Sequence, residues 1–410
     1  MITANLSIRG DPMQPKAETV RAVNRLTRRW AGAQAGVEST VFSSPSLWPL
    51  LALLADPAAG PARQELEEAV GVRADRAIRM AHDLLDAFSS IRGTRTALGL
   101  WTAEDLSLYP EWTLRLPTGL TGRLDKDPAV SRKRLDAWAA EHTDGLIPSM
   151  PVQVDDATQL VLAGAQLVRT RWLRPFTDTL LWPQEGPWRD RPLLGLHRTS
   201  SLLDRLAVVG TPSGPLTVLK VLGSTGVDVH LLLGPAQWTP SEVLAQGIDA
   251  LHGEAVTGDR LPLGEPGPGV SVTDERGFRP DRPQLHVTTT PFRIEAHHDL
   301  MVQAALYGLV TASDGSSGHF PGIGPSPLAV QRAAQSALAV FDAKGFESAA
   351  VSAVLAAPGS APPRRGYPVR RLTAPVDRPF GFLTVHRTSR LVLAAGWVAD
   401  PVPYPEDDRR

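Results

Sequence analysis

The sequence of 410 residues contains no cysteine, which excludes disulfide bonds, thiolate metal sites and thiol nucleophiles. Long runs of like charge are also missing. The formal net charge is −1 at pH 7, and a run such as residues 132–134 is only three residues long. The chain therefore shows neither a basic stripe for nucleic acid nor a basic face for a membrane. No apolar run reaches the roughly 18 residues of a membrane span, and residues 1–18 lack the apolar core of a secretory signal. We expect a cytoplasmic protein that binds neither nucleic acid nor membranes.

Residues for a large core are present, and the first third of the chain favours helices. Apolar residues make up 42% of the sequence, with ten Trp and ten Phe as bulky anchors. Residues 17–33 carry an apolar stripe at three- and four-residue steps, and residues 47–54 are apolar almost throughout. Residues 61–70 begin with proline and stop before Gly71, and residues 127–145 begin with an aspartate that can cap a helix.

The pattern changes after residue 155, where extended segments begin. Strands are predicted over residues 156–172, 215–221, 227–233, 285–294, 376–386 and 390–398. Residues 240–252 favour a helix, and residues 259–283, rich in Gly, Pro and charge, favour a loop. Residues 328–345 fit either a helix or a strand, and propensity favours the helix. Residues 345–375 contain five Pro and three Gly and have no pattern of their own, so they are either a functional loop or a wrong assignment.

The order of short motifs along the chain resembles the serpin family. The motifs are FSSPSLW (42–48), AAGPARQELEEAVG (58–71), SRKRLDAWAAEHTDGLIPSM (131–150), LVLAGAQLVRTRWLRPF (160–176), PFRIEAHHDL (291–300), LYGL (306–309), HFPGI (319–323) and VDRPFGFLTVHRTSRLVLAAGWVADP (376–401). Each fragment alone is weakly specific, but together they stand in the order and spacing of the family. The chain is therefore identified as a bacterial-type member with a divergent hinge and gate.

The resemblance implies a single α/β domain over residues 17–401, with three β-sheets, eight or nine helices and an exposed reactive-centre loop at about 345–375. Residues 1–16 and 402–410 are expected to be flexible termini. Residues 328–342 become a strand that leads into the loop, against their helix propensity. The protein is expected to be a monomer with no catalytic residue, no cofactor and no metal.

The implied function is inhibition of serine-type endopeptidases by a suicide-substrate mechanism. A trypsin- or subtilisin-like protease cleaves the loop, and the N-terminal part of the loop then inserts into the central sheet. A second interpretation stays open: a non-inhibitory serpin-fold protein that binds a partner or is cleaved without trapping the protease.

The resemblance assigns the hinge of the loop to six residues: Gly345, Phe346, Glu347, Ser348, Ala349 and Ala350. Alternate residues of an inserted strand face the interior, and from Ser348 onward this inward set is small and uncharged. Phe346 stands where inhibitory members have Thr or Ser, so we expect that its ring must find space before later residues can enter. A merely flexible linker is the alternative interpretation of this segment.

The gate and the cleaved bond also depart from the family pattern. The Asn and His of the family's gate fall at Gly164 and Gln335, so their usual paired hydrogen bond cannot form and repacking is expected. Ser46 matches the gate serine, and Trp172 matches the tryptophan at the top of the sheet. The usual hinge length places the cleaved bond at Gly359–Ser360, whereas side-chain chemistry favours Arg364 or Arg365.

Other reactive-looking groups have simpler explanations. His297 and His298, beside Asp299, lack a third metal ligand in the sequence and are expected to have surface or capping roles at a helix start. The segment GEPGPG (264–269) is interpreted as a loop, since two prolines remove phosphate-binding donors. Residues 316–319 do not form a nucleophile-elbow motif, which argues against a hydrolase triad.

Overall fold

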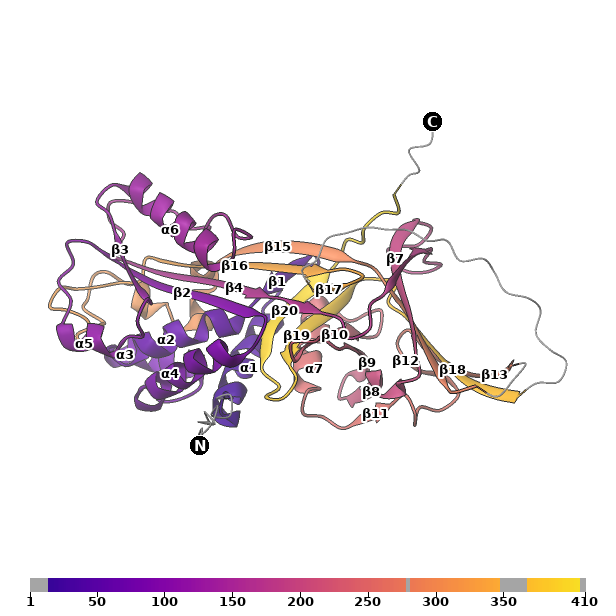
Figure 1. The fold of residues 1–410 in the computed structure, drawn as a ribbon. Helices are drawn as coiled ribbons and strands as arrows, with labels where there is room; N and C mark the ends of the chain where they lie inside the picture. The colour runs from indigo at the N-terminus through magenta and orange to yellow at the C-terminus, as the bar shows by residue number, and fades with distance from the viewer. Residues whose placement is uncertain (1–13, 278–280, 347–366, 406–410) are drawn as a thin grey trace, which may run out of the picture.

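The computed structural model describes residues 14–277, 281–346 and 367–405 (Figure 1). These residues form eight α-helices: α1 (Ala17–Gly32), α2 (Trp48–Ala55), α3 (Gly60–Val70), α4 (Ala74–Ser90), α5 (Pro110–Arg115), α6 (Pro128–His142), α7 (Pro240–Asp249) and α8 (Ala304–Tyr307). Four short 3₁₀ helices are η1 (Ser44–Ser46), η2 (Leu203–Arg205), η3 (Leu300–Gln303) and η4 (Thr311–Ser313). No helix in the described ranges has the length and hydropathy needed to cross a lipid bilayer.

The predicted helices form where their capping residues and apolar stripes indicate. The apolar stripe of α1 is buried from Val20 to Trp30. Asp127 caps α6 by accepting a hydrogen bond from the backbone N–H of Ala129. Thr239 and Glu242 form a complete capping box at the start of α7.

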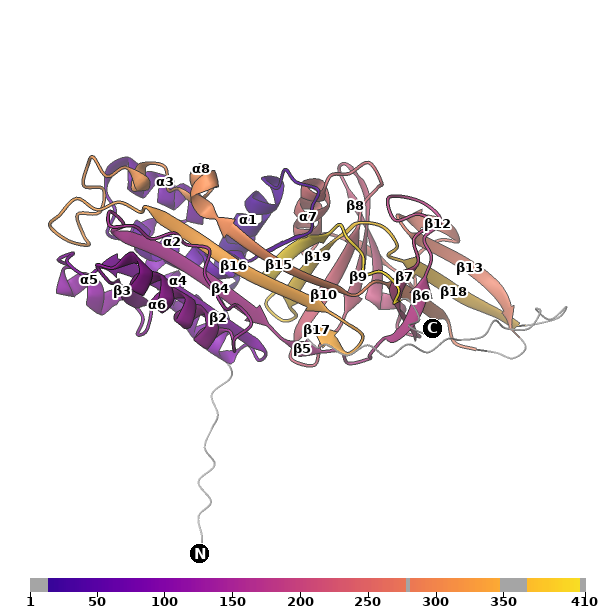
Figure 2. The same ribbon diagram turned by 90° about the horizontal axis from the view of Figure 1, so that it is seen from above.

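The central sheet has the strand order β3-β2-β4-β16-β17-β5, with β15 paired to β16. Its strands are β2 (Thr94–Ala103), β3 (Thr121–Leu124), β4 (Leu160–Val168), β5 (Thr170–Arg171), β15 (Phe292–Asp299), β16 (Arg332–Phe341) and β17 (Gly345–Phe346). Figure 2 shows β2, β4, β16 and β15 side by side, with β17 and β5 at one end. Helix α6 lies on one face of this sheet, and α2 to α4 lie on the other (Figure 1).

Helices on both faces explain why every residue of β4 is buried. Val161 and Ala163 belong to the apolar cluster that includes Leu135 of α6. Leu160 and Leu162 belong to the larger cluster on the opposite face. The prediction of a strand covered on both sides is therefore confirmed.

Two further sheets complete the domain. The second sheet has the order β1-β20-β19-β10-β9-β8-β11, and the third has the order β12-β13-β18-β14-β7-β6. The strands of the second sheet are β1 (Thr40–Phe42), β8 (Leu206–Thr211), β9 (Gly214–Val221), β10 (Val227–Leu233), β11 (Ala255–Thr257), β19 (Phe380–His386) and β20 (Val392–Val398). The strands of the third sheet are β6 (Thr177–Leu181), β7 (Leu193–Ser200), β12 (Gly264–Gly267), β13 (Val270–Gly277), β14 (Gln284–Thr289) and β18 (Tyr367–Pro375). Three sheets and an α/β class agree with the expected fold.

Residues 332–341 are strand β16, although their alanines favour a helix. Parallel pairing with β4 and antiparallel pairing with β15 override the local propensity. The strand that the family resemblance implies is therefore present.

Two loop predictions are wrong. Residues 259–283 contain β12 and β13, and the C-terminal part of 345–375 contains β18. GEPGPG is accordingly not a loop throughout, because its first four residues form β12 at the outer edge of the third sheet. Proline is tolerated at an edge, where the missing N–H does not interrupt the ladder. Strand β18 pairs with β13 on one side and β14 on the other, and these partners are distant in sequence.

The expected flexible C-terminal segment also needs a correction. The backbone N–H of Leu194 donates to the carbonyl of Val402, and that of Tyr404 donates to the carbonyl of Pro192. Residues 402–404 are therefore attached to the start of β7. The expected N-terminal segment lies mostly outside the described residues.

Candidate functional site

Strand β17 is held between two other strands at one end of the central sheet. Gly345 pairs with Arg171 and Phe346 pairs with Thr170, while Phe346 also pairs with Phe341 of β16. Earlier in β16, residues Arg332 to Ala337 pair directly with β4. The direct pairing of β16 with β4 thus ends before the position of β17.

A tight turn connects β16 to β17. The Asp342 carboxylate accepts hydrogen bonds from the N–H groups of Lys344 (2.7 Å) and Gly345 (2.9 Å). A Cβ atom on Gly345 would lie 2.5 Å from the Thr170 carbonyl oxygen, so a larger residue would push the two strands apart. Glycine is therefore required by the close approach of the neighbouring strand.

Phe346 is already accommodated in the structure. Only 3% of its surface is exposed, and its ring centroid lies 6.4 Å from that of Phe382. The ring that we expected to need space before the loop can enter is therefore already buried in this structure. The second sheet supplies an apolar wall for the ring, and sequence reasoning could not place Phe382 beside it.

Trp172 supports the same end of the sheet. Its indole Nε1 donates to the carbonyl of Asp342 at 2.8 Å, and its ring lies 4.8 Å from that of Phe341. Its backbone N–H donates to the carbonyl of Lys344 at 2.9 Å. The tryptophan therefore fixes the turn that precedes β17.

Gln335, Gly164 and Ser46 come together in the middle of the sheet. Gln335 lies opposite Gly164, and its Nε2 donates to the Ser46 hydroxyl at 2.7 Å. Its Oε1 accepts the backbone N–H of Ser43 at 2.9 Å. A Cβ atom at Gly164 would lie 2.4 Å from the Ser46 carbonyl oxygen. The long amide therefore reaches η1, while the glycine lets η1 approach β4.

The sequence analysis does not identify two buried polar residues beside this network, Ser43 and Gln166. The Ser43 hydroxyl lies against the side-chain carbonyl of Gln166 and 2.7 Å from the Leu393 carbonyl. Gln166 is 4% exposed, and its Nε2 has no partner among the described residues. Glutamine within the apolar run of residues 160–168 was the signal available in the sequence.

A cavity of about 430 Å³ lies beside β17. Its walls are Gly93, Arg169, Thr170, Arg171, Ser224, Thr225 and Phe346. The Thr225 hydroxyl donates to the Thr170 hydroxyl at 2.9 Å. Phe346 contributes to the wall of this cavity, although it is almost fully buried.

Most of the predicted loop residues lie outside the described part of the chain. These are Glu347, Ser348, Ala349, Ala350, Gly359, Ser360, Arg364 and Arg365. Their assignment to the hinge and to the cleaved bond stays a prediction.

Arg370 and Arg371, the next basic pair along the chain, are part of strand β18. Arg371 forms an ion pair with Glu275 at 2.5 Å, and Arg370 donates to the carbonyl of Leu261. Both residues pair with β13, and Arg371 also pairs with β14. A protease that binds an extended loop therefore has no access to these bonds in the folded chain.

The histidine pair lies on strand β15 and not at a helix start, which corrects the sequence interpretation. His298 Nε2 donates to the carbonyl of Val41 at 2.8 Å, and burial lowers the pKa of this imidazole. His297 Nδ1 lies 3.0 Å from the Ser336 hydroxyl, while Asp299 caps η3. The described residues contain no group of three ligands suited to a metal ion.

Comparisons with known proteins match part of the first half of the chain with a family model and most of the chain with individual relatives and structures. A family model described as Serpin (serine protease inhibitor) matches residues 23–184. Serpin-Z2B of Oryza sativa subsp. japonica is 25% identical over 88% of this chain and 91% of its own length. The structure of native protease nexin-1 with heparin covers 94% of this chain and 100% of its own, with a TM-score of 0.70 at 16% identity. Thyroxine-binding globulin in complex with thyroxine covers 94% and 99%, with a TM-score of 0.69 at 16% identity.

Proposed function

Because this chain is a member of the serpin family, we propose that it inhibits serine-type endopeptidases as a suicide substrate. In this proposal a trypsin- or subtilisin-like protease cleaves the segment between β17 and β18. The segment after Phe346 then extends β17 between β16 and β4. The observation that supports the proposal is the position of β17, which is already paired on both sides at the top of the central sheet.

The pairing of β17 defines a register for the proposed insertion. Both of its ladders are antiparallel. Each residue added after Phe346 would therefore pair with a residue one position earlier in β16 and one position earlier in the β4–β5 segment. Six residues beyond Phe346, Ser352 would lie between Gln335 and Gly164. Those two residues already face each other across the closed sheet, so the two ladders lead to the same position.

The same register indicates what insertion would change. The parallel ladder between Arg332–Ala337 and Val161–Gln166 would be replaced by two antiparallel ladders. Parallel pairing is slightly weaker per residue, and each added ladder hydrogen bond contributes roughly 1 kcal/mol. Ser352 would lie on the face of Gln335, next to the amide that now bonds η1. A small hydroxyl residue suits this position, since it can join the network without displacing the core.

Incubation with trypsin, subtilisin and thermolysin tests the proposal, with an SDS gel and a thermal melt as readouts. We expect an SDS-stable complex with trypsin or subtilisin, and a marked rise in melting temperature after cleavage. Thermolysin, which forms no acyl-enzyme, should raise the melting temperature without a complex. Cleavage that leaves the melting temperature unchanged would exclude insertion and favour a static role.

A second candidate function is binding of a small organic molecule by the static fold. A cavity of about 140 Å³ lies between α7 and strands β8 to β10, and His230, Lys220 and Arg390 contribute to its wall. His230 is 3% exposed, and burial lowers the pKa of its imidazole to about 3. Benzoate is the probe for this candidate, because a cavity of this size holds a single ring. A shift of the melting temperature that His230→Ala removes would support it.

A further inference from the structure

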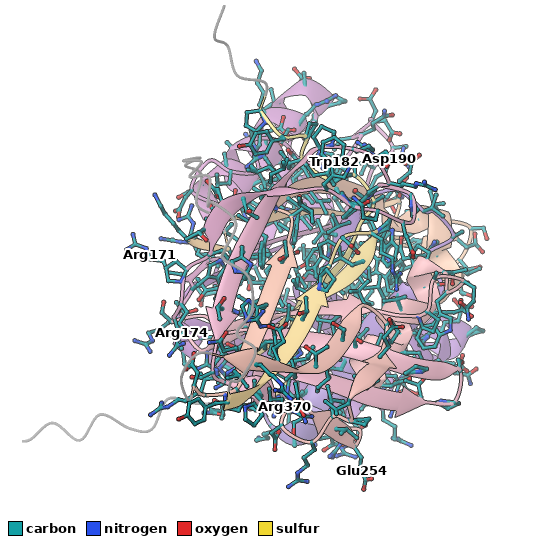
Figure 3. All side chains as sticks on the ribbon, turned by 90° about the vertical axis from the view of Figure 1, so that its right-hand side faces the viewer. Arg171, Arg174, Trp182, Asp190, Glu254 and Arg370 are labelled. Carbon is teal, nitrogen blue, oxygen red and sulfur yellow. The ribbon has the colours of Figure 1, made fainter. Side chains whose placement is uncertain are left out.

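A cavity of about 180 Å³ lies where the central, second and third sheets meet. Four basic side chains from four separate segments form part of its wall: Arg174 after β5, Arg198 on β7, Arg205 in η2 and Lys220 on β9. The remaining wall is Ser200 and three leucines, Leu173, Leu202 and Leu222. Arg174 lies at the mouth of the cavity and extends outward in Figure 3.

Arg198 is the most unusual member of this wall. It lies opposite Val287 in the β7–β14 ladder, and Val287 is buried, so the guanidinium occupies the inner face of the third sheet. It stacks on the Phe176 ring at 4.3 Å, and its Nη1 donates to the Arg174 carbonyl at 2.8 Å. Its buried Nε has no partner among the described residues. An unsatisfied donor on an inner sheet face is costly unless another group accepts from it.

The positive charge of the wall is largely uncompensated. Within the described residues only Arg205 has a carboxylate partner, Asp204 at 3.0 Å, and that carboxylate is 54% exposed. Burial, with smaller contributions from the Arg174 and Arg205 charges, lowers the pKa of Arg198 to about 10. Burial, then Arg390 and Arg205, also lower the pKa of Lys220, while Asp204 and Asp228 oppose this effect. The cations therefore repel one another across the cavity, and an anion placed there would remove this repulsion.

The hydrogen-bonding character of the wall restricts the ligand further. The Ser200 hydroxyl oxygen accepts the backbone N–H of Leu202 at 3.1 Å, so its own hydrogen can be donated into the cavity. Every polar side chain of the wall is therefore a donor. Leu173 and Leu202 are 56% and 41% exposed and offer apolar surface beside these donors.

We propose that this pocket binds a small amphiphilic anion, in which a carboxylate, sulfate or phosphate group is joined to a short apolar chain. The anionic head accepts from Arg198, Arg174 and the Ser200 hydroxyl, and the apolar chain covers the exposed leucines. The site is separate from the insertion site at β17 and does not require protease inhibition.

Isothermal titration with three probes tests the site: hexyl sulfate, inorganic sulfate and 1-hexanol. We expect the affinity order hexyl sulfate, sulfate, hexanol, because only hexyl sulfate uses both the donors and the leucines. Equal affinity for hexyl sulfate and hexanol would overturn the role of the basic wall. Equal affinity for hexyl sulfate and sulfate would overturn the amphiphilic character.

Single variants locate the binding on the protein. Arg174→Met and Arg198→Met should each weaken hexyl sulfate binding by about tenfold or more, since each removes a charge-assisted hydrogen bond. Arg191→Met is the matched control, because Arg191 is exposed, precedes strand β7 and is not part of the wall of the cavity. Binding that persists unchanged in both pocket variants would contradict the proposal.

Melting temperatures measured with and without ligand separate a loss of binding from a folding defect in these variants. Arg174 is exposed, so its substitution should leave the fold intact. Arg198→Met should melt at the same or a higher temperature without ligand, because it removes an unpaired, partly buried charge. Hexyl sulfate should raise the melting temperature of the parent protein and of Arg191→Met, and of neither pocket variant. An unchanged rise in the pocket variants would place the ligand elsewhere.

Discussion

At the residue scale, the middle of the central sheet combines a long amide with a missing side chain. Gln335 reaches Ser43 and Ser46, and Gly164 gives η1 room to approach β4. Glycine at 164 and glutamine at 335 complement each other, since a side chain at 164 would displace the backbone of η1 that the Gln335 amide binds. The family's usual pair is thus replaced by a different network, in which both ends of the Gln335 amide are bonded.

Gly164→Ala tests this complementarity. The added methyl would lie 2.4 Å from the Ser46 carbonyl oxygen, so we expect a loss of about 2 kcal/mol in the free energy of unfolding. Chemical denaturation measures the loss. Gly210→Ala is the control, because a Cβ atom at Gly210 meets nothing within 4 Å. Equal stability of the two variants would show that η1 does not approach β4 this closely.

Phe346→Ala tests whether the hinge side chain is part of the core before any cleavage. The ring is 3% exposed, so we expect its removal to cost about 3 kcal/mol of unfolding free energy in the uncleaved protein. Val302→Ala, at a residue that is 80% exposed, should change stability by less than about 0.5 kcal/mol. A Phe346 variant as stable as the Val302 variant would mean that the ring lies outside the core.

His230 makes stability dependent on pH. Burial first, and then Lys220, lower its folded-state pKa to about 3, with Arg390 adding to this effect and Asp228 opposing it. The unfolded chain therefore binds a proton below about pH 6.5 that the folded chain does not. Stability is lost as pH falls through this window, by about 2 kcal/mol between pH 6.5 and pH 5.

The contribution of His230 is isolated by comparing denaturation of the parent protein and His230→Gln at pH 7.5 and pH 5. Other histidines with lowered pKa, such as His298 and His386, act in the same direction in both proteins. The variant should lose less stability on acidification than the parent. An identical loss in both proteins would rule out His230 as its source.

At the element scale, β12 and β13 form a hairpin that covers β18 along its outer edge. Strand β13 pairs with seven residues of β18, from Tyr367 to Thr373, and Arg371 adds an ion pair to Glu275. Strand β18 is therefore an interior strand of its sheet. The basic residues within it are structural in the folded protein.

Limited trypsin digestion of the folded protein should leave the paired strand β18 intact. We expect cleavage after Arg364 or Arg365 and none after Arg370 or Arg371, because a paired strand cannot adopt the extended pose that a protease binds. Mass spectrometry of the fragments identifies the bonds, and urea-unfolded protein provides the reference in which all four are cleaved. Early cleavage after Arg370 or Arg371 in the native protein would contradict the interior position of β18.

At the scale of the whole molecule, the proposed function depends on opening one ladder. The parallel pairing of β4 with β16 closes the central sheet below β17, and no covalent link holds these strands together, since the chain has no cysteine. The ladder is short, and the network around Gln335 lies at its centre. Opening it therefore requires only the separation of two segments about six residues long.

Ser352→Pro tests the insertion register. Proline lacks the N–H that a central strand donates, so we expect the variant to be cleaved normally but to gain little melting temperature on cleavage. Ser352→Thr keeps both the N–H and the hydroxyl and should gain as much as the parent. A proline variant that still shows the full gain would mean that residue 352 does not enter the sheet.

The local elements of this protein were largely determined by its sequence, because capping residues, apolar stripes and alternating runs act over a few positions. Helices α1, α3, α6 and α7 and the buried strand β4 follow from such patterns. Only the tertiary structure decided the pairings between distant segments. Strands β12, β13 and β18 carry prolines, glycines and charges that favour loops, and they are strands because each completes the hydrogen bonds of another. The burial of Phe346, the Gln335 network and the basic pocket likewise depend on which segments the fold brings together, which no local pattern encodes.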